Sequence, residues 1–174
     1  MEYKLILKNQ LASLSGLMIF TILLMITVWL VGLNEGFGSD LFFFFSVFYL
    51  INLLPVIFVH YQYYNANKDK ELLIEMDKKQ LLIKTHNSVK TINFKEIQKI
   101  EIYMMPSMYR GINFQLFPFE SYHYAVIETK DKEKIIITSL IVVNLTKLFT
   151  DLNINVVRKR CIFPNINSSI DRLT

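Results

Sequence analysis

The feature that most constrains this chain is a pair of long, uncharged apolar runs near its start, Leu11 to Val31 and Leu41 to Val59. A helix of about 20 residues is roughly 30 Å long, which matches the hydrocarbon thickness of a bilayer. Two such runs are hard to bury in a domain this small. Because backbone polar groups in lipid must be satisfied within the segment, we predict two membrane-spanning α-helices, over about residues 11–31 and 41–60.

The charges around these runs predict an orientation. The interruption from Gly32 to Asp40 contains two acidic residues and no lysine or arginine. Basic residues flank the pair on its two outer sides: Lys4, Lys8, Lys68 and Lys70. Because lysine and arginine are retained on the cytoplasmic side, the interruption is predicted to be a short external turn. The chain is therefore expected to be a two-pass integral membrane protein with both termini in the cytoplasm.

Two residues inside the second run have special backbone or polar character. Pro55 removes a backbone donor and predicts a kink about one turn earlier. Asn52 places an amide in an apolar region, where it is expected to hydrogen-bond to the first helix or to the backbone freed by the proline. A self-association or gating element is the second interpretation of the same pair.

After residue 65 the hydrophobic period changes to two, which is typical of strands. Polar turns separate three such runs into a meander, over residues 71–77, 81–86 and 89–94. A brief turn over 95–98 leads to a strand over 99–104, which Pro106 ends. Further elements are predicted as a hairpin over 121–130 and 134–142, a helix over 145–152 capped by Asn144, and a strand or extended tail over 154–163.

The phrase FKEIQKIEIY carries a family resemblance. Phe94, Ile97 and Ile100 match an aromatic-x-x-Ile-x-x-Ile pattern that introduces the fourth strand of bacterial pleckstrin-homology-like (PH-like) domains on small membrane proteins. The chain resembles that family over roughly residues 65–152. In eukaryotic relatives a basic pattern on the first hairpin binds phosphoinositides, but here a histidine, His86, stands at its last position, so inositide binding is not expected.

The resemblance implies an α+β membrane protein of the bacterial cytoplasmic (inner) membrane. A transmembrane hairpin would occupy residues 1–64, a cytosolic PH-like domain residues 65–163 and a polar tail residues 164–174. The domain would be a bent β-sheet or partial barrel of about seven antiparallel strands, capped by a C-terminal helix. A further strand within residues 111–117 would complete that count.

The residue inventory excludes several classes of function. A single cysteine, Cys161, forms no intrachain disulfide, and the three histidines have no metal-ligand spacing, so no metal site is expected. The chain has no glycine-rich phosphate loop and no hydrolase or metalloprotease motif, so no cofactor and no enzymatic activity are predicted. Its lysines alternate with acids, whereas nucleic-acid binding needs a denser basic stripe.

The aromatic and methionine-rich segment from Met104 to Tyr124 is the first candidate site. It is predicted to be either core and membrane-facing packing or a surface for a protein partner or small ligand. The candidate binding residues in it are Tyr109, Arg110, Phe117, Phe119, Tyr122 and His123. The second candidate is a basic run, which is either a solvated surface or a contact with anionic lipid headgroups: Arg158, Lys159 and Arg160.

These features favour a non-catalytic binding or assembly module, held at the cytoplasmic face, that recruits a protein partner or serves as an accessory subunit of a membrane complex. The alternative is a membrane-disrupting antiviral effector, in which two helices assemble when a small β-barrel senses a cyclic nucleotide. A sensor or transporter accessory that reads anionic lipid is a third hypothesis. Fold resemblance does not choose among these, because function depends on sites.

Overall fold

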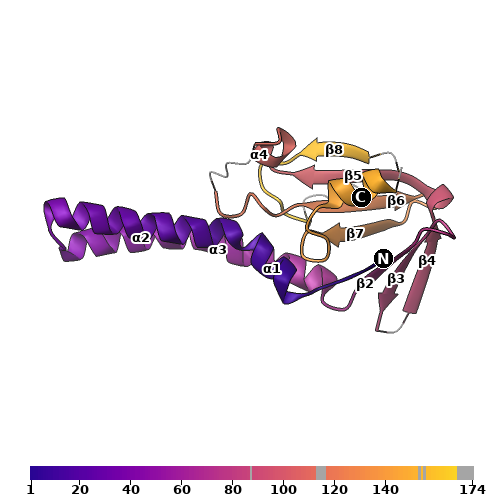
Figure 1. Ribbon diagram of the computed structural model, residues 1–174, viewed down its shortest axis with the longest axis horizontal. Helices are drawn as coiled ribbons and strands as arrows, with labels where there is room; N and C mark the ends of the chain where they lie inside the picture. The colour runs from indigo at the N-terminus through magenta and orange to yellow at the C-terminus, as the bar shows by residue number, and fades with distance from the viewer. Residues whose placement is uncertain (87, 113–116, 153, 155, 168–174) are drawn as a thin grey trace.

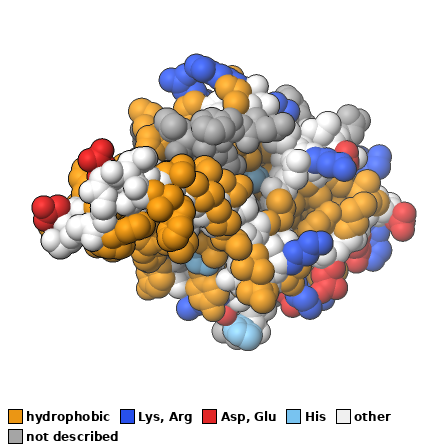
Figure 2. Space-filling model, turned by 60° about the vertical axis from the view of Figure 1, so that its left-hand side comes forward, with side chains coloured by type: hydrophobic (Ala, Val, Ile, Leu, Met, Phe, Trp, Pro, Cys, Tyr) orange, Lys and Arg blue, Asp and Glu red, His pale blue; other side chains and the backbone are white. Residues whose placement is uncertain are grey.

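The computed structural model describes residues 1–86, 88–112, 117–152, 154 and 156–167. A helical hairpin projects from one end of a domain built from two β-sheets (Figure 1). Its helices are α1 (Leu7–Ser13), α2 (Ser15–Glu35) and α3 (Ser39–Asn67). By length and composition α2 and α3 are apolar enough to cross a membrane. Hydrophobic side chains cover the visible face of the hairpin, whereas charged side chains of both signs are mixed over the sheet domain (Figure 2).

The turn between α2 and α3 is shorter than the sequence predicts. The prediction places it over residues 32–40, but only Gly36 to Gly38 separate the two helices. Gly36 ends α2 with a φ of +88°, a conformation that glycine adopts at little cost. Gly32 lies inside α2 under the ring of Phe37, where a Cβ atom would be only 2.1 Å from Phe37 Cε1. Both helices thus extend into polar residues that hydropathy alone assigns to the turn.

Helix α3 runs unbroken through Pro55 and past the predicted end at residue 60. Its last turns bury one face, made of Val56, Val59, Tyr63 and Asn67. This spacing of three and four residues places the side chains on a single stripe. The helix is longer than predicted because the sheet domain provides a packing surface for that stripe.

Asn52 makes a local contact within α3. Its Nδ2 donates to the carbonyl oxygen of Phe48 at 2.9 Å, one turn earlier. The contact is therefore neither to α2 nor to the backbone freed by Pro55, which are the two partners that the sequence predicts. A role of Asn52 and Pro55 in self-association or gating stays a prediction.

The first sheet is antiparallel in the order β1-β2-β3-β4. Its strands are β1 (Glu2–Lys4), β2 (Glu71–Glu75), β3 (Gln80–Thr85) and β4 (Ser88–Asn93). The meander of β2, β3 and β4 agrees with the sequence pattern. Strand β1 was not predicted, and it pairs with β2 so that Tyr3 lies opposite Leu72. The hairpin is therefore inserted between two neighbouring strands of one sheet.

The second sheet has the order β7-β6-β5-β8. A single turn of 3-10 helix, η1 (Phe94–Glu96), precedes it, in agreement with the predicted brief turn. Its strands are β5 (Ile97–Met104), β6 (Tyr124–Thr129), β7 (Lys134–Thr138) and β8 (Val156–Arg160). Strand β8 pairs with β5 in parallel, which corrects the prediction of an all-antiparallel sheet. In the described part of the chain eight strands form two sheets that do not close into a barrel.

The predicted closing helix is confirmed as α5 (Leu145–Asp151). The Asn144 side chain caps it by accepting a hydrogen bond from the Lys147 backbone at 2.9 Å. A four-residue helix, α4 (Pro106–Tyr109), follows β5. Within the predicted strand at 111–117, residues 113–116 lie outside the described residues. The same is true of 168–174 in the predicted polar tail, whereas Pro164 and Ile166 are buried.

Strand β6 of the second sheet is buried on both faces. The inner face of that sheet, including Ile100 and Ile127, packs against the first sheet and α5 in one hydrophobic cluster. Its other face, including Tyr124 and Val126, packs against the end of α3 in a second cluster. This explains why β6 is almost continuously buried rather than alternating. The same packing fixes α3 directly to the sheet domain.

Candidate binding surface

The segment after β5 begins with an exposed corner. Pro106 occupies the first position of α4, where its missing N–H costs no helical hydrogen bond. Gly111, with a φ of +69°, follows the helix. Tyr109 and Arg110 are both exposed at this corner. The local turn chemistry therefore presents one aromatic ring and one guanidinium group to the surroundings.

Aromatic stacking connects the returning half of this segment to the hairpin. Phe117 is exposed and stacks on Phe119, with ring centroids 5.4 Å apart. Phe119 is half-buried and makes an edge contact with Phe163 at 5.3 Å. Phe163 in turn stacks on Phe58 of α3 at 6.3 Å. The exposed ring of Phe117 is thus the outer end of a row of rings that begins on α3.

Tyr122 and His123 lie inside the molecule. Tyr122 is fully buried, and its hydroxyl lies 2.9 Å from Nδ1 of His60 on α3. Because burial raises the pKa of Tyr122, the phenol stays protonated, and the His60 tautomer decides which of the two groups donates this hydrogen bond. His123 is 3% exposed and its Nδ1 lies 3.0 Å from the carbonyl oxygen of Ser121, to which it donates. Burial lowers the pKa of His123, which favours the neutral ring.

Further polar contacts bind the hairpin to the second sheet and its loops. The Ser121 hydroxyl donates to the backbone carbonyl of Ser13 at 2.6 Å. Asn67 Nδ2 donates to the Tyr63 carbonyl and to Thr138 Oγ1, both at 2.7 Å. The six candidate residues therefore divide into exposed ones, Tyr109, Arg110 and Phe117, and ones that are half-buried or buried, Phe119, Tyr122 and His123. Their role in binding stays a prediction.

The substitution Asn67→Ala is expected to destabilise the junction between α3 and β7 by about 1–3 kcal/mol, because Asn67 is fully buried and its loss leaves Thr138 without this donor. Chemical unfolding of the full chain in detergent measures the effect. Asn65→Ala, at an exposed position of the same helix, is the matched control and should change the free energy of unfolding by less than about 0.5 kcal/mol. Equal effects of the two substitutions would show that the buried amide does not hold the junction.

The three basic residues of β8 are exposed but do not share one face. Lys159 Nζ lies 3.6 Å from Glu101 Oε1, so this cation already has an acidic neighbour. Arg158 lies opposite the inward-facing Ile102, and Arg160 has the same parity. The two arginines therefore point to the other side of the strand from Lys159. Contact of this run with lipid headgroups stays a prediction. The two arginines are better candidates for that contact than Lys159.

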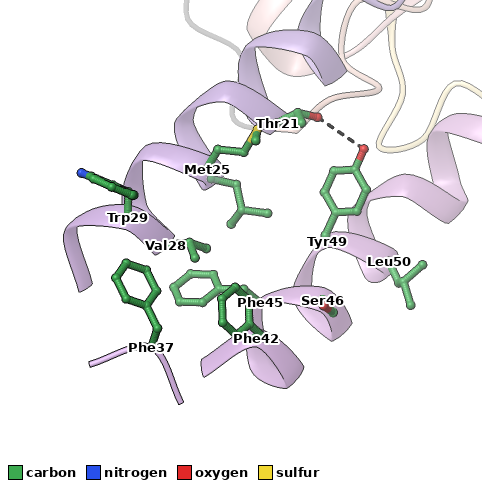
Figure 3. A pocket seen from close by; sticks show the side chains of 11 residues that line it. Thr21, Met25, Val28, Trp29, Phe37, Phe42, Phe45, Ser46, Tyr49 and Leu50 are labelled. Atoms are coloured by element: carbon green, nitrogen blue, oxygen red, sulfur yellow. Dashed lines mark hydrogen bonds between the residues drawn. The ribbon is translucent and has the colours of Figure 1, made fainter. Parts of the chain in front are cut away.

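An apolar groove of about 790 Å³ lies between α2 and α3. Trp29, Phe37, Phe42 and Tyr49 are among its lining residues (Figure 3). Near the turn, Phe37 contacts Trp29 at 5.9 Å and Phe42 at 6.3 Å between ring centroids. The Thr21 hydroxyl makes a polar contact across the groove, 3.4 Å from the Tyr49 hydroxyl (Figure 3). The rings therefore brace the hairpin near its turn.

A second cleft, of about 680 Å³, is not predicted by the sequence. It lies beside the end of α3, and its lining includes Gln62, Lys70, Ile83 and Lys134. In the sequence Lys70 indicates only the cytoplasmic flank of the hairpin. No local pattern reveals the cleft, because its lining is divided among α3, the β3–β4 hairpin and β7, which lie far apart in the sequence.

A comparison with protein families matched residues 2–149 to a family described as "PH domain". The match begins in β1, includes the hairpin and ends within α5. Comparisons with curated proteins and with solved structures found no match to the chain. The family match covers most of the 174 residues and agrees with the two sheets and closing helix described above. The chain therefore belongs to the PH domain family.

Proposed function

We propose that this chain is a non-catalytic PH-like binding module that α2 and α3 anchor in the bacterial cytoplasmic membrane. The observation that carries the proposal is the exposure of the hairpin: only 6% and 11% of the residues in the most apolar windows of α2 and α3 are buried. A helix in the core of a soluble domain would be mostly buried. PH domains generally serve binding rather than catalysis, which supports the same conclusion.

Helix lengths support a position close to the membrane surface. The 21 residues of α2 are roughly 32 Å long, close to the hydrocarbon thickness of about 30 Å. The 29 residues of α3 are roughly 44 Å long, so about 14 Å of helix extends beyond the hydrocarbon. The basic flanks support a cytoplasmic position for that extension and for the sheet domain. The buried end of α3 then holds the sheet domain at the headgroup layer.

We place the partner-binding surface on the exposed residues of the segment from Met104 to Tyr124, which are Tyr109, Arg110 and Phe117. Ile112 is also exposed, so apolar and basic groups occur together in this part of the chain. Such a mixture fits a protein partner, since aromatic residues and arginine dominate the buried centres of interfaces. A partner that binds there would be recruited to the cytoplasmic face of the membrane.

Site-specific photo-crosslinking tests the surface in cells. A photoreactive residue in place of Tyr109 is expected to give a crosslinked adduct of one defined mass, and the same residue in place of the exposed Lys95 is the control. Adding Arg110→Glu and Phe117→Ser should reduce the adduct at least about tenfold, because the two remaining side chains of the surface are then replaced. Repeated recovery of the uncrosslinked chain alone contradicts partner recruitment. Toxicity on overexpression that requires a cyclic nucleotide would favour the effector instead.

A further inference from the structure

The apolar groove between α2 and α3 carries an inference that rests on the proposed membrane anchoring. Its volume of about 790 Å³ is within the usual range for small-molecule sites. Thr21 and Leu50 line one end of the groove, and they lie at the middle of the two predicted spans. Trp29 and Phe37 line the other end, beside the turn (Figure 3). In the proposed membrane the groove therefore extends from the midplane to the external surface.

The length of the groove matches one leaflet of a bilayer. From Thr21 to Trp29 helix α2 rises about 12 Å, and half of the hydrocarbon thickness is about 15 Å. Apolar side chains from both helices, among them Met25, Val28 and Phe45, line the same space (Figure 3). An acyl chain of a lipid in the external leaflet has this length and this chemistry.

The hydroxyl groups at the inner end of the groove have partners within the hairpin. Thr21 Oγ1 donates to the carbonyl oxygen of Leu17 at 2.8 Å and lies 3.4 Å from the Tyr49 hydroxyl. The rest of the lining is apolar apart from Ser46 and the indole N–H of Trp29. Because the paired hydroxyls need no outside partner, the groove favours hydrocarbon over a polar ligand.

Two carboxylates lie at the external end of the hairpin. Glu35 ends α2 and Asp40 lies in the first turn of α3, and both residues are exposed. Residues 9–67 contain no lysine or arginine. Within the described part of the chain neither carboxylate forms an ion pair. The hairpin therefore presents two negative charges and no positive side chain to the external headgroups.

This charge pattern distinguishes between possible occupants of the groove. A second copy of the chain would have the same orientation in the membrane, so its carboxylates would lie beside those of the first copy and repel them. An anionic headgroup would be repelled for the same reason. A primary ammonium group has the opposite charge and also donates N–H hydrogen bonds to carboxylates. A choline headgroup is cationic at its end but has no N–H donor.

We infer that the groove binds an external-leaflet phospholipid whose headgroup ends in a primary ammonium group, as in phosphatidylethanolamine. One acyl chain lies against Met25, Val28 and Phe45, and the ammonium group pairs with Glu35 or Asp40. The bound chain fills the space between the helices and so fixes their spacing in the half of the hairpin near the turn.

The test uses the fluorescence of Trp29, which is the single tryptophan of the chain and lines the groove. The full chain is reconstituted in phosphatidylcholine vesicles that contain a small fraction of one lipid brominated on its acyl chains near the headgroup, since bromine quenches tryptophan on contact. Brominated phosphatidylethanolamine should quench about threefold more than brominated phosphatidylcholine at equal mole fraction, which is the enrichment expected from exposed ion pairs. Brominated phosphatidylglycerol should quench no more than brominated phosphatidylcholine.

Variants of the groove and of the carboxylates test the two halves of the site. Ser46→Phe fills the groove from an exposed lining position and should reduce quenching by phosphatidylethanolamine to the phosphatidylcholine level. Val47→Phe is the matched control, because Val47 is exposed at the next position but does not line the groove, and it should leave the difference unchanged. Glu35→Gln combined with Asp40→Asn should also abolish the difference between the two lipids.

The inference and the proposed anchoring fail in different ways. If no brominated lipid quenches Trp29, the hairpin lies outside the bilayer, and both are wrong. If the three lipids quench alike, if Ser46→Phe and Val47→Phe behave alike, or if the carboxylate variant retains the difference, the anchoring stands and the inference is overturned. Quenching by brominated phosphatidylcholine in every variant shows that each one still inserts, so a lost difference is not a lost fold.

Discussion

Replacing Phe149 with alanine is expected to lower the free energy of unfolding of the sheet domain by about 3–5 kcal/mol. Phe149 is fully buried in α5, within the cluster that joins the inner faces of both sheets. Removing its ring loses apolar burial and leaves a cavity that the surrounding strands fill only in part. Because a domain is typically stable by about 5–15 kcal/mol, this loss is a large fraction of the total.

Hydrogen exchange of the β5 and β6 amides, followed by mass spectrometry, measures this loss. Trp29 is not a suitable probe, because it lies on the hairpin rather than in the sheet domain. Lys147→Ala is the control, since Lys147 is exposed on the same helix and its substitution should change stability by less than about 0.5 kcal/mol. Unchanged protection of the sheets in Phe149→Ala would mean that α5 does not close the core.

The parts of the fold that follow from local patterns could be predicted. The two helices follow from uncharged runs, and the strands of the meander follow from alternation that ends in polar turns. The closing helix follows from Asn144, whose side chain caps it, and from the apolar stripe behind that cap. The turn at Phe94–Glu96 follows from the change between three-residue and two-residue spacing. In each case residues that are close together in the sequence are sufficient to predict the element.

The parts that depend on distant partners could not be predicted. Strand β1 has only three residues, and it becomes a strand because Tyr3 lies opposite Leu72 across the entire hairpin. Strand β8 joins β5 in parallel, with Val156 opposite Ile100. Neither short segment has a pattern that specifies its partner or its direction. Pairing of this kind is decided by which sheet edges remain open once the rest of the domain has folded.

The sequence predicts only part of the candidate site, for a related reason. The segment from Met104 to Tyr124 is aromatic throughout, and composition alone does not separate the exposed Tyr109 from the buried Tyr122. The separation comes from α3, which contacts Tyr122 through His60 at its predicted end and through Tyr63 beyond that end. A helix boundary set by hydropathy thus conceals the contact that decides which rings remain available.

Cysteine labelling of intact spheroplasts is expected to give an all-or-none result for the proposed orientation. In a Cys161→Ser background, Gly38→Cys should react with a membrane-impermeant maleimide, whereas Lys95→Cys should react only after permeabilisation. Gly38 lies between α2 and α3, where a Cβ atom meets nothing within 4 Å, so the substitution is tolerated. Lys95 is exposed in η1, at the opposite side of the predicted membrane.

The native cysteine is expected to contribute little background labelling to this experiment. Cys161 is half-buried, and burial raises the pKa of its thiol to about 11, so little thiolate is present at neutral pH. The serine substitution removes the remaining background. Labelling of Lys95→Cys in intact spheroplasts would place the sheet domain outside, and protection of both positions would place the turn inside. Either outcome contradicts the orientation that the basic flanks imply, because lysines on both outer sides of the hairpin should hold the domain and the chain ends in the cytoplasm.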